Sequence, residues 1–201
     1  MIRSIHSFTQ KITFISPYLL GMLLFLIIYV RLCSNDSNID GDAHFNNGQY
    51  AEALESYNEY LMLHPHHIKT LYNRGRCYDE LSQHHKAFVD YEAVLSRDPD
   101  NVKALVSLSK FYYRTENYEA AANLSSRAAM VEEDNYLAHY HKARACHKLG
   151  WVGDALDAYN ETIELNPDFG FAYFQRSSIL ISIGLHPFGC YDLKVAANLN
   201  V

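Results

Sequence analysis

The hydrophobic positions of this chain follow two patterns, and the first is an unbroken apolar run. Residues 12–30 hold nineteen consecutive positions without a charged side chain. A helix rises about 1.5 Å per residue, so this run would extend roughly 28 Å, enough to cross the hydrocarbon core of a bilayer. Lys11 and Arg31 flank the run, and Tyr29 lies near its end, where an amphipathic ring favours the headgroup zone. We therefore expect residues 1–33 to form an N-terminal tip and a transmembrane anchor, with membrane contact through residues 12–30.

Flanking charge predicts how this anchor is oriented. Arg3 and Lys11 precede the run, whereas only Arg31 follows it before acidic residues begin. An excess of Lys and Arg marks the cytoplasmic side of a span. We expect a single-pass membrane protein with a cytoplasmic N-terminus and an extracytoplasmic main part, periplasmic in a bacterium. Three alternatives stay open: a cleaved signal peptide, a lipoprotein acylated at Cys33, and an organelle anchor whose main part faces the cytosol.

The second pattern is a 34-residue period, marked by Pro65, Pro99 and Pro167. It divides the remaining chain into the windows 34–67, 68–101, 102–135, 136–169 and 170–201. Small residues recur at the eighth position (Gly41, Gly75, Ser109, Ala143, Ser177) and at the twentieth (Ala53, Ala87, Ala121, Ala155, Gly189). Turn residues recur at the fifteenth: Gly48, Ser82, Gly150 and Gly184. This spacing predicts two closely packed antiparallel helices per window, with a turn between them and a proline ending the second.

Aromatic positions indicate how successive windows would pack. Tyrosine occupies the twenty-fourth position of three windows, as Tyr57, Tyr91 and Tyr159. We expect this ring to fill the gap to the next unit. A single helix pair cannot bury its own apolar face, so the units must stack on one another.

The segments GDAHFNNGQYAEALESYNEYLMLHP and NRGRCYDELSQHHKAFVDYEAVLSRDP resemble the tetratricopeptide repeat, and the likeness extends over about 168 of the 201 residues. The resemblance implies an all-α fold in which residues 34–201 form a right-handed α-solenoid of about five helix-turn-helix repeats. Its concave face, lined by the first helix of each repeat, would hold extended or helical peptides. Two departures are visible: Glu133 replaces proline in the third window, and Pro187 and Phe188 are expected to distort the second helix of the fifth.

The resemblance also implies which side chains would face a bound partner, because positions 2, 5, 9, 12 and 13 of the first helix tend to line the groove. In the middle windows these positions supply the candidate partner-binding residues Lys69, Tyr72, Arg76, Lys103, Lys110, Tyr113, Arg114, Tyr140, Arg144 and Lys148. Their charge predicts a protein or peptide partner that is acidic or bears carboxylates, with tyrosines as rigid contact surface. The alternative is that these charges only solvate an open face.

One known use of such repeats, a clamp for the C-terminal carboxylate of heat-shock chaperones, is disfavoured. Its Lys and Asn positions are matched here only by Asn73 and Lys103. Asn38, Asp42 and Ser107 occupy the other three positions.

Motifs for chemistry are not found in this sequence. No phosphate loop, GxSxG or HExxH occurs. Histidines cluster at His64, His66 and His67 and again at His84 and His85, but these places lie at opposite ends of a helix pair, so we expect no shared metal. Cys77, Cys146 and Cys190 are expected to be small core residues. We therefore expect a protein that is not an enzyme and binds no cofactor or metal.

The distribution of charge along the chain predicts how acidic and basic residues divide between the two sides of the solenoid. The net charge of −6 divides into +3 over residues 1–31 and −9 over the rest. This balance argues against a nucleic-acid partner. Acidic residues fall mainly on the predicted second helices and loops (Glu52, Glu55, Glu59, Asp90, Glu92, Asp154, Asp157). We expect an acidic convex side and a basic concave side.

The end of the last window adds one more expectation. Leu193, Val195, Ala196 and Leu199 would have an uncovered side, which predicts self-association or a docked partner at this edge. Taken together, the patterns favour a membrane-anchored, non-catalytic scaffold that binds a protein or peptide. The alternative is an accessory or assembly factor that positions the substrate of an envelope enzyme or secretion complex.

Overall fold

The computed structural model describes residues 21–22, 25–26, 38 and 40–201. The chain divides into two compact units, Met1–Pro65 and His66–Val201. Apart from residues 21, 22, 25 and 26, the predicted anchor lies outside the described residues, and so does its predicted boundary with the repeats at residue 33. In the part of the chain that the structure describes, no helix combines the length and the apolar character that a membrane crossing requires.

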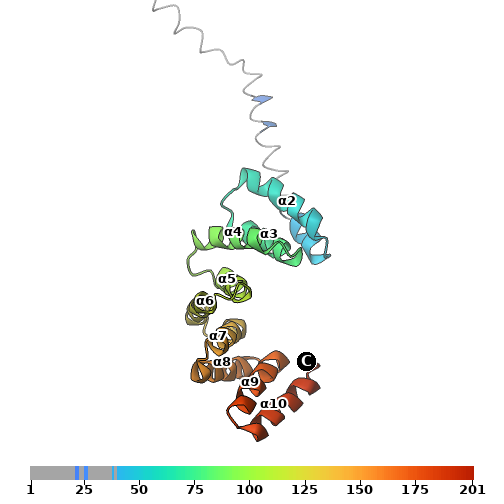
Figure 1. The fold of residues 1–201 in the computed structure, drawn as a ribbon. Helices are drawn as coiled ribbons and strands as arrows, with labels where there is room; N and C mark the ends of the chain where they lie inside the picture. Colours follow the sequence, from blue (N-terminus) through green and yellow to red (C-terminus); the bar gives the residue numbers. More distant parts are fainter. Residues whose placement is uncertain (1–20, 23–24, 27–37, 39) are drawn as a thin grey trace, which may run out of the picture. The chain divides into compact units, whose positions relative to one another are not determined.

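The described residues form helices and turns without strands, as the repeat pattern predicts. In the first unit, helical residues 40–46 precede α2 (Tyr50–Leu63). The second unit contains α3 (Ile68–Glu80), α4 (His84–Leu95), α5 (Val102–Arg114), α6 (Tyr118–Val131), α7 (Tyr136–Lys148), α8 (Val152–Leu165), α9 (Gly170–Ser182) and α10 (His186–Asn198). We call α3, α5, α7 and α9 the first helices and α2, α4, α6, α8 and α10 the second helices. From α3 to α10 the helices stack as successive pairs (Figure 1), and the first helices begin 34 residues apart.

The tight turn inside each pair depends on one residue with positive φ. That residue is always at the fifteenth position: Gly48, Ser82, Glu116, Gly150 and Gly184 have φ between 58° and 84°. Glycine adopts this conformation at little cost, whereas Ser82 and Glu116 hold it against steric strain. Glu116 was not expected to belong to this set, because nothing in its side chain favours a turn.

Small residues at the eighth position allow the paired helices to approach. A Cβ atom added to Gly75 would lie 2.6 Å from the ring of Tyr91, and one added to Gly41 would lie 2.6 Å from the ring of Tyr57. Each tyrosine therefore packs on the glycine of its own repeat. The missing Cβ opens space for the ring within the pair itself, and Tyr91 also interacts with Ser107 on α5 of the next repeat.

Two further expectations are corrected in the last pair. Pro187 lies in the first turn of α10, where no intrahelical hydrogen bond needs its missing N–H, so the helix continues regularly to Asn198. The edge expected to be uncovered is smaller than predicted: Ala196 is buried and Leu199 lies against Gly170. Of the four edge residues, Leu193 alone counts as exposed.

Candidate functional site

The candidate partner-binding residues lie on one side of α3, α5 and α7. Because a helix turns about 100° per residue, positions 2, 5, 9, 12 and 13 fall within about 100° of one another around the axis. The structure leaves the lysines Lys69, Lys103, Lys110 and Lys148 exposed, together with Arg76 and Arg114. Tyr72, Tyr113 and Arg144 are half-buried. We call these residues, with Tyr140, the first-helix face.

A row of cations runs across this face at the ninth position of three successive first helices. Arg76 lies on α3, Lys110 on α5 and Arg144 on α7. Within the described residues, Lys110 forms no ion pair, so its charge is available to a ligand. A row of this kind presents positive charge along the direction in which the repeats stack, which suits an elongated acidic segment.

Arg144 is held in place by aromatic rings. Its guanidinium carbon lies 4.0 Å from the ring centre of Tyr113 on α5 and 5.5 Å from that of Tyr140 on its own helix. Stacking of this kind leaves the edge of the guanidinium free to donate hydrogen bonds, a geometry suited to a carboxylate. Tyr140 was predicted to contact a partner, but it is buried beneath Arg144 and only 8% exposed, so it supports the face without presenting a surface.

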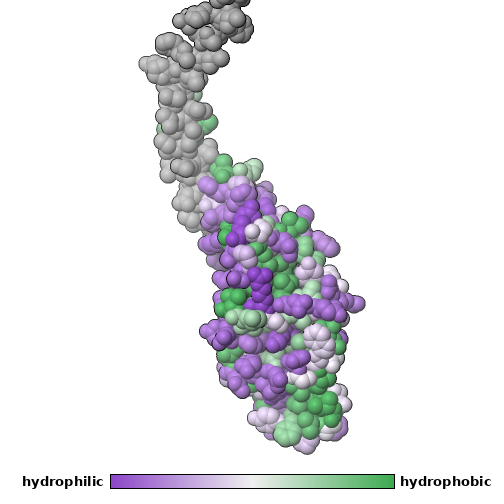
Figure 2. All heavy atoms as spheres, turned by 90° about the vertical axis from the view of Figure 1, so that its left-hand side faces the viewer, coloured by the Kyte–Doolittle hydropathy of each residue, from purple (hydrophilic) through white to green (hydrophobic). Residues whose placement is uncertain are grey.

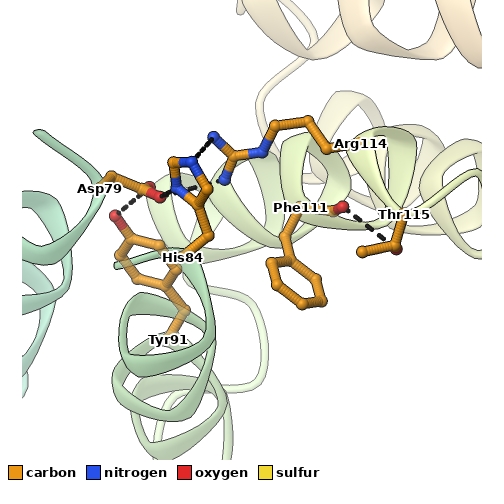
Figure 3. A network of polar contacts seen from close by, with 6 residues as sticks. All are labelled: Asp79, His84, Tyr91, Phe111, Arg114 and Thr115. Atoms are coloured by element: carbon orange, nitrogen blue, oxygen red, sulfur yellow. Dashed lines mark hydrogen bonds and ion pairs between the residues drawn. The ribbon is translucent and has the colours of Figure 1, made fainter. Parts of the chain in front are cut away.

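Arg114, which was also predicted to bind a partner, forms an internal contact as well. Its Nη2 donates to Asp79 Oδ1 at 3.1 Å, joining α5 to α3 (Figure 3). The same carboxylate accepts from the Tyr91 hydroxyl at 3.0 Å and contacts His84 Nδ1 at 3.0 Å. Asp79 therefore connects three helices at this end of the pair. Asp79 at position 12 of its window and Arg114 at position 13 of the next share one face by helical spacing, but spacing does not show that the two side chains pair.

The character of the first-helix side changes at α9. There the equivalent positions carry Phe171 and Phe174, which are 52% and 46% exposed. Phe169 lies beneath them, 4.9 Å from the ring centre of Tyr140 in an edge-to-face arrangement and 5.2 Å from that of Tyr136. An aromatic surface therefore continues the basic one. Helical spacing alone places Phe171 and Phe174, at positions 2 and 5 of their window, on this face.

A buried histidine lies under the cationic row. His141 on α7 is 8% exposed, and burial, with smaller contributions from Arg144 and Lys110, lowers its pKa to about 3. Burial likewise lowers the pKa of His147. His141 therefore stays neutral near physiological pH and acts as a polar core residue.

Two buried ion pairs were not predicted. Arg74 binds Asp90 through Nε at 2.8 Å and Nη2 at 2.6 Å, and Arg176 binds Asp192 through the same two nitrogens, each at 2.8 Å. Both pairs join position 7 of a first helix to position 23 of the second helix. Asp90 was assigned to an acidic outer surface, but it is 2% exposed and paired. The sequence signal was the sixteen-residue spacing of Arg and Asp in two windows.

Histidines and cysteines take local roles. His67 caps α3 by accepting from the Thr70 amide, and His84 belongs to the Asp79 network. Cys77 and Cys146 are buried as predicted, whereas Cys190 is exposed, because it lies on the side of α10 away from α9. Among the described residues, no group of three or more His, Cys, Asp or Glu side chains is placed to hold a metal ion.

Comparison with known families identifies the repeats. A family model described as Tetratricopeptide repeat matches residues 40–101, and one described as Anaphase-promoting complex, cyclosome, subunit 3 matches residues 83–162. The chain is 32% identical over 78 residues to the Tetratricopeptide repeat and J domain-containing co-chaperone DNJ1 of Cryptococcus neoformans, which covers 39% of this chain and 15% of that protein. It is 26% identical over 131 residues to the Photosystem I assembly protein Ycf3 of Synechococcus sp. strain WH7803, covering 64% of each. The chain thus matches only part of these relatives' lengths.

Solved structures agree on the fold. The crystal structure of MamA protein has a TM-score of 0.72 and 21% sequence identity, covering 83% of this chain and 91% of that one. MamA 41-end from Desulfovibrio magneticus RS-1 has a TM-score of 0.76 and 14% identity, covering 84% and 95%. At these identities the likeness concerns the fold alone. The two family models and the repeat-containing relatives identify the helix pairs within residues 40–162 as tetratricopeptide repeats.

Proposed function

We propose that this chain is a non-catalytic, membrane-anchored scaffold whose first-helix face holds a carboxylate-rich segment of a partner protein. The observation that carries the proposal is the row formed by Arg76, Lys110 and Arg144 on successive first helices. The stacking of Arg144 on Tyr113 supports it further, because a guanidinium held at 4.0 Å from a ring loses little entropy on binding. Proteins of this family are built to bind other proteins, which is consistent with this use.

The anchor is the part of the proposal that rests on sequence. Residues 12–30 have the length and composition of a span, and the flanking charges favour a cytoplasmic N-terminus. Membrane fractionation of the full chain, followed by protease treatment of sealed vesicles, tests both points. Recovery in the soluble fraction would contradict the anchor, and digestion of the repeats from the cytoplasmic side would reverse the proposed topology.

The binding face is tested by charge reversal. The variant Arg76→Glu/Lys110→Glu/Arg144→Glu changes the row without touching the buried ion pairs. A matched control reverses three exposed cations of the second helices: Lys86, Arg127 and Lys194. Partners recovered with the full wild-type chain and identified by mass spectrometry should be lost with the first variant and retained with the control. Retention with unchanged salt dependence in the first variant would contradict a role for this face.

A second candidate function is that of an accessory or assembly factor, which positions one component of a larger complex. The similarity to Photosystem I assembly protein Ycf3 over 64% of both chains favours it. Size-exclusion chromatography of the recovered partner distinguishes the two. If the partner is a subunit of a stable complex and binds this chain only before that complex assembles, the result would support the assembly role. Equal binding of this chain to the free and the assembled partner would support a simple scaffold.

Self-association through the C-terminal edge is a separate part of the proposal. Leu193 is 38% exposed at this edge and offers a modest contact. Light scattering of the full chain should show a dimer that Leu193→Asp converts to a monomer. A wild-type monomer at high concentration would rule this contact out.

A further inference from the structure

A pocket of about 430 Å³ opens between α8, α9 and α10, on the side formed by the second helices. Its walls are mainly apolar: Leu156, Leu180, Leu185, Phe188 and Tyr191. Phe188 is 64% exposed and Tyr191 65% exposed, so two large rings stand at its mouth. Figure 2 shows hydrophobic residues gathered at the lower end of the molecule, at the height of α10 in Figure 1.

The polar groups of the pocket already satisfy one another. Arg176 binds both oxygens of Asp192, and its Nη1 donates to Asn160 Oδ1 at 2.7 Å. Asp192 is 1% exposed, so the carboxylate lies beneath the surface with its charge paired. A charged ligand group would have to break this arrangement, whereas an apolar side chain would cover it without loss. The pocket therefore suits a large apolar side chain.

Comparison of the repeats shows that the rings at the mouth lie where two of the four other second helices carry acidic residues. Phe188 and Tyr191 occupy positions 19 and 22 of the last window. The same positions are acidic in two other second helices, Glu52 and Glu55 in α2 and Asp154 and Asp157 in α8. Solvent exposure alone would favour the acidic choice here as well. Two exposed rings in their place indicate a surface that another molecule covers.

The rim on the α8 side is acidic. Exposed carboxylates follow a helical stripe along α8, formed by Asp154, Asp157, Glu161 and Glu164. This stripe lies one residue, or about 100°, around the helix from Leu156 and Asn160, which line the pocket. The sequence of α8 contains no Lys or Arg, and within the described residues none of the four carboxylates forms an ion pair. A segment lying in the pocket would therefore meet uncompensated negative charge beside it.

We propose that this pocket docks a segment of a partner protein that inserts a large apolar side chain and places Lys or Arg along the acidic stripe. The chemistry is opposite to that of the first-helix face, which is cationic. The chain would thus carry two independent docking surfaces that select partners of opposite charge. This inference does not depend on the proposed function of the first-helix face.

The probe for this surface is a short fluorescein-labelled helical peptide with leucine on one side and lysine on the other, titrated with the full chain by fluorescence anisotropy. Phe188→Asp/Tyr191→Asp gives α10 the acidic pattern of α8 and should weaken binding at least about tenfold. Val89→Asp is the matched control, because Val89 is 63% exposed at the position in α4 that Tyr191 holds in α10. It should bind like wild type, and both variants should keep the wild-type circular dichroism spectrum.

Charge and specificity are tested separately. Asp157→Lys/Glu161→Lys should weaken binding several-fold and flatten its salt dependence. A peptide with glutamate in place of lysine, or serine in place of leucine, should not bind. Reversal of Arg76, Lys110 and Arg144 should leave binding unchanged, which separates this surface from the first-helix face.

Several outcomes would overturn the inference. Equal binding by wild type and the Phe188→Asp/Tyr191→Asp variant would show that the pocket is not the site. Equal binding of the glutamate peptide would contradict the role of the stripe. A wild-type dimer that the Phe188→Asp/Tyr191→Asp variant dissociates would show that a second copy of the chain covers the rings. Binding of lipid vesicles in preference to the peptide would show that the pocket contacts a membrane.

Discussion

The buried pair of Arg74 and Asp90 offers a sharp test of how the repeats are stabilised. The side chain of Asp90 is 3% exposed and that of Arg74 is 22% exposed. Arg74→Leu leaves a carboxylate almost fully buried without its partner, which should cost about 3–5 kcal/mol. Asp90→Leu leaves a guanidinium that reaches water with about a fifth of its surface, so its cost should be smaller, about 2 kcal/mol.

The double variant shows whether the ion pair itself stabilises the fold or whether the single variants lose stability only because they leave one charge unpaired. In the third repeat the same positions 7 and 23 are Leu108 and Leu124, and Leu108 is fully buried there. The fold thus already accommodates an apolar pair at this place. The free energy of unfolding of the Arg74→Leu/Asp90→Leu variant should therefore lie within about 1 kcal/mol of the wild-type value, because no unpaired charge remains.

Urea denaturation followed by far-UV circular dichroism measures these differences. The midpoints can be compared directly where the dependence of the unfolding free energy on urea concentration is the same for each variant. A double variant that loses as much stability as the two single variants together would refute the reasoning. It would mean that the ion pair supplies specific stability that apolar packing cannot replace.

Three further predictions follow from single residues. His141, with its pKa lowered to about 3 by burial, is charged only in the unfolded chain between about pH 3 and 6.5. Its contribution should therefore lower the stability as the pH decreases from 6.5, by up to about 1.4 kcal/mol per pH unit, and His141→Phe should reduce the slope of stability against pH by this amount in pH-dependent melts. Glu116→Gly should raise stability by about 0.5–1 kcal/mol, because φ of 63° strains a residue with a Cβ; an unchanged midpoint in urea would contradict this. The Tyr159 hydroxyl is buried without a hydrogen-bond partner among the described residues, whereas the Tyr91 hydroxyl donates to Asp79, so Tyr159→Phe should be neutral or stabilising and Tyr91→Phe should cost about 1 kcal/mol in thermal unfolding.

Much of the repeat architecture could be predicted because it depends on local rules that recur. Each pair needs a residue that tolerates positive φ at position 15 and a small residue at position 8, and these needs fix the register. Helical spacing alone then places Arg76, Lys110 and Arg144 on one face. Such features follow from the chain's own geometry, so they are visible before any contact is known.

The tertiary structure decided how the charges are used. Arg114 and Tyr140 have the positions of ligand-binding residues, but Asp79 on a neighbouring helix neutralises one and Arg144 covers the other. The sequence likewise cannot show that Asp90 is buried, because an acidic residue on a helix is normally solvated. Whether a charge faces a partner or another side chain depends on contacts between residues far apart in the chain. The sequence by itself determined the repeat, its register and the face of each helix, and the packing of one helix on the next determined which of those side chains remain available.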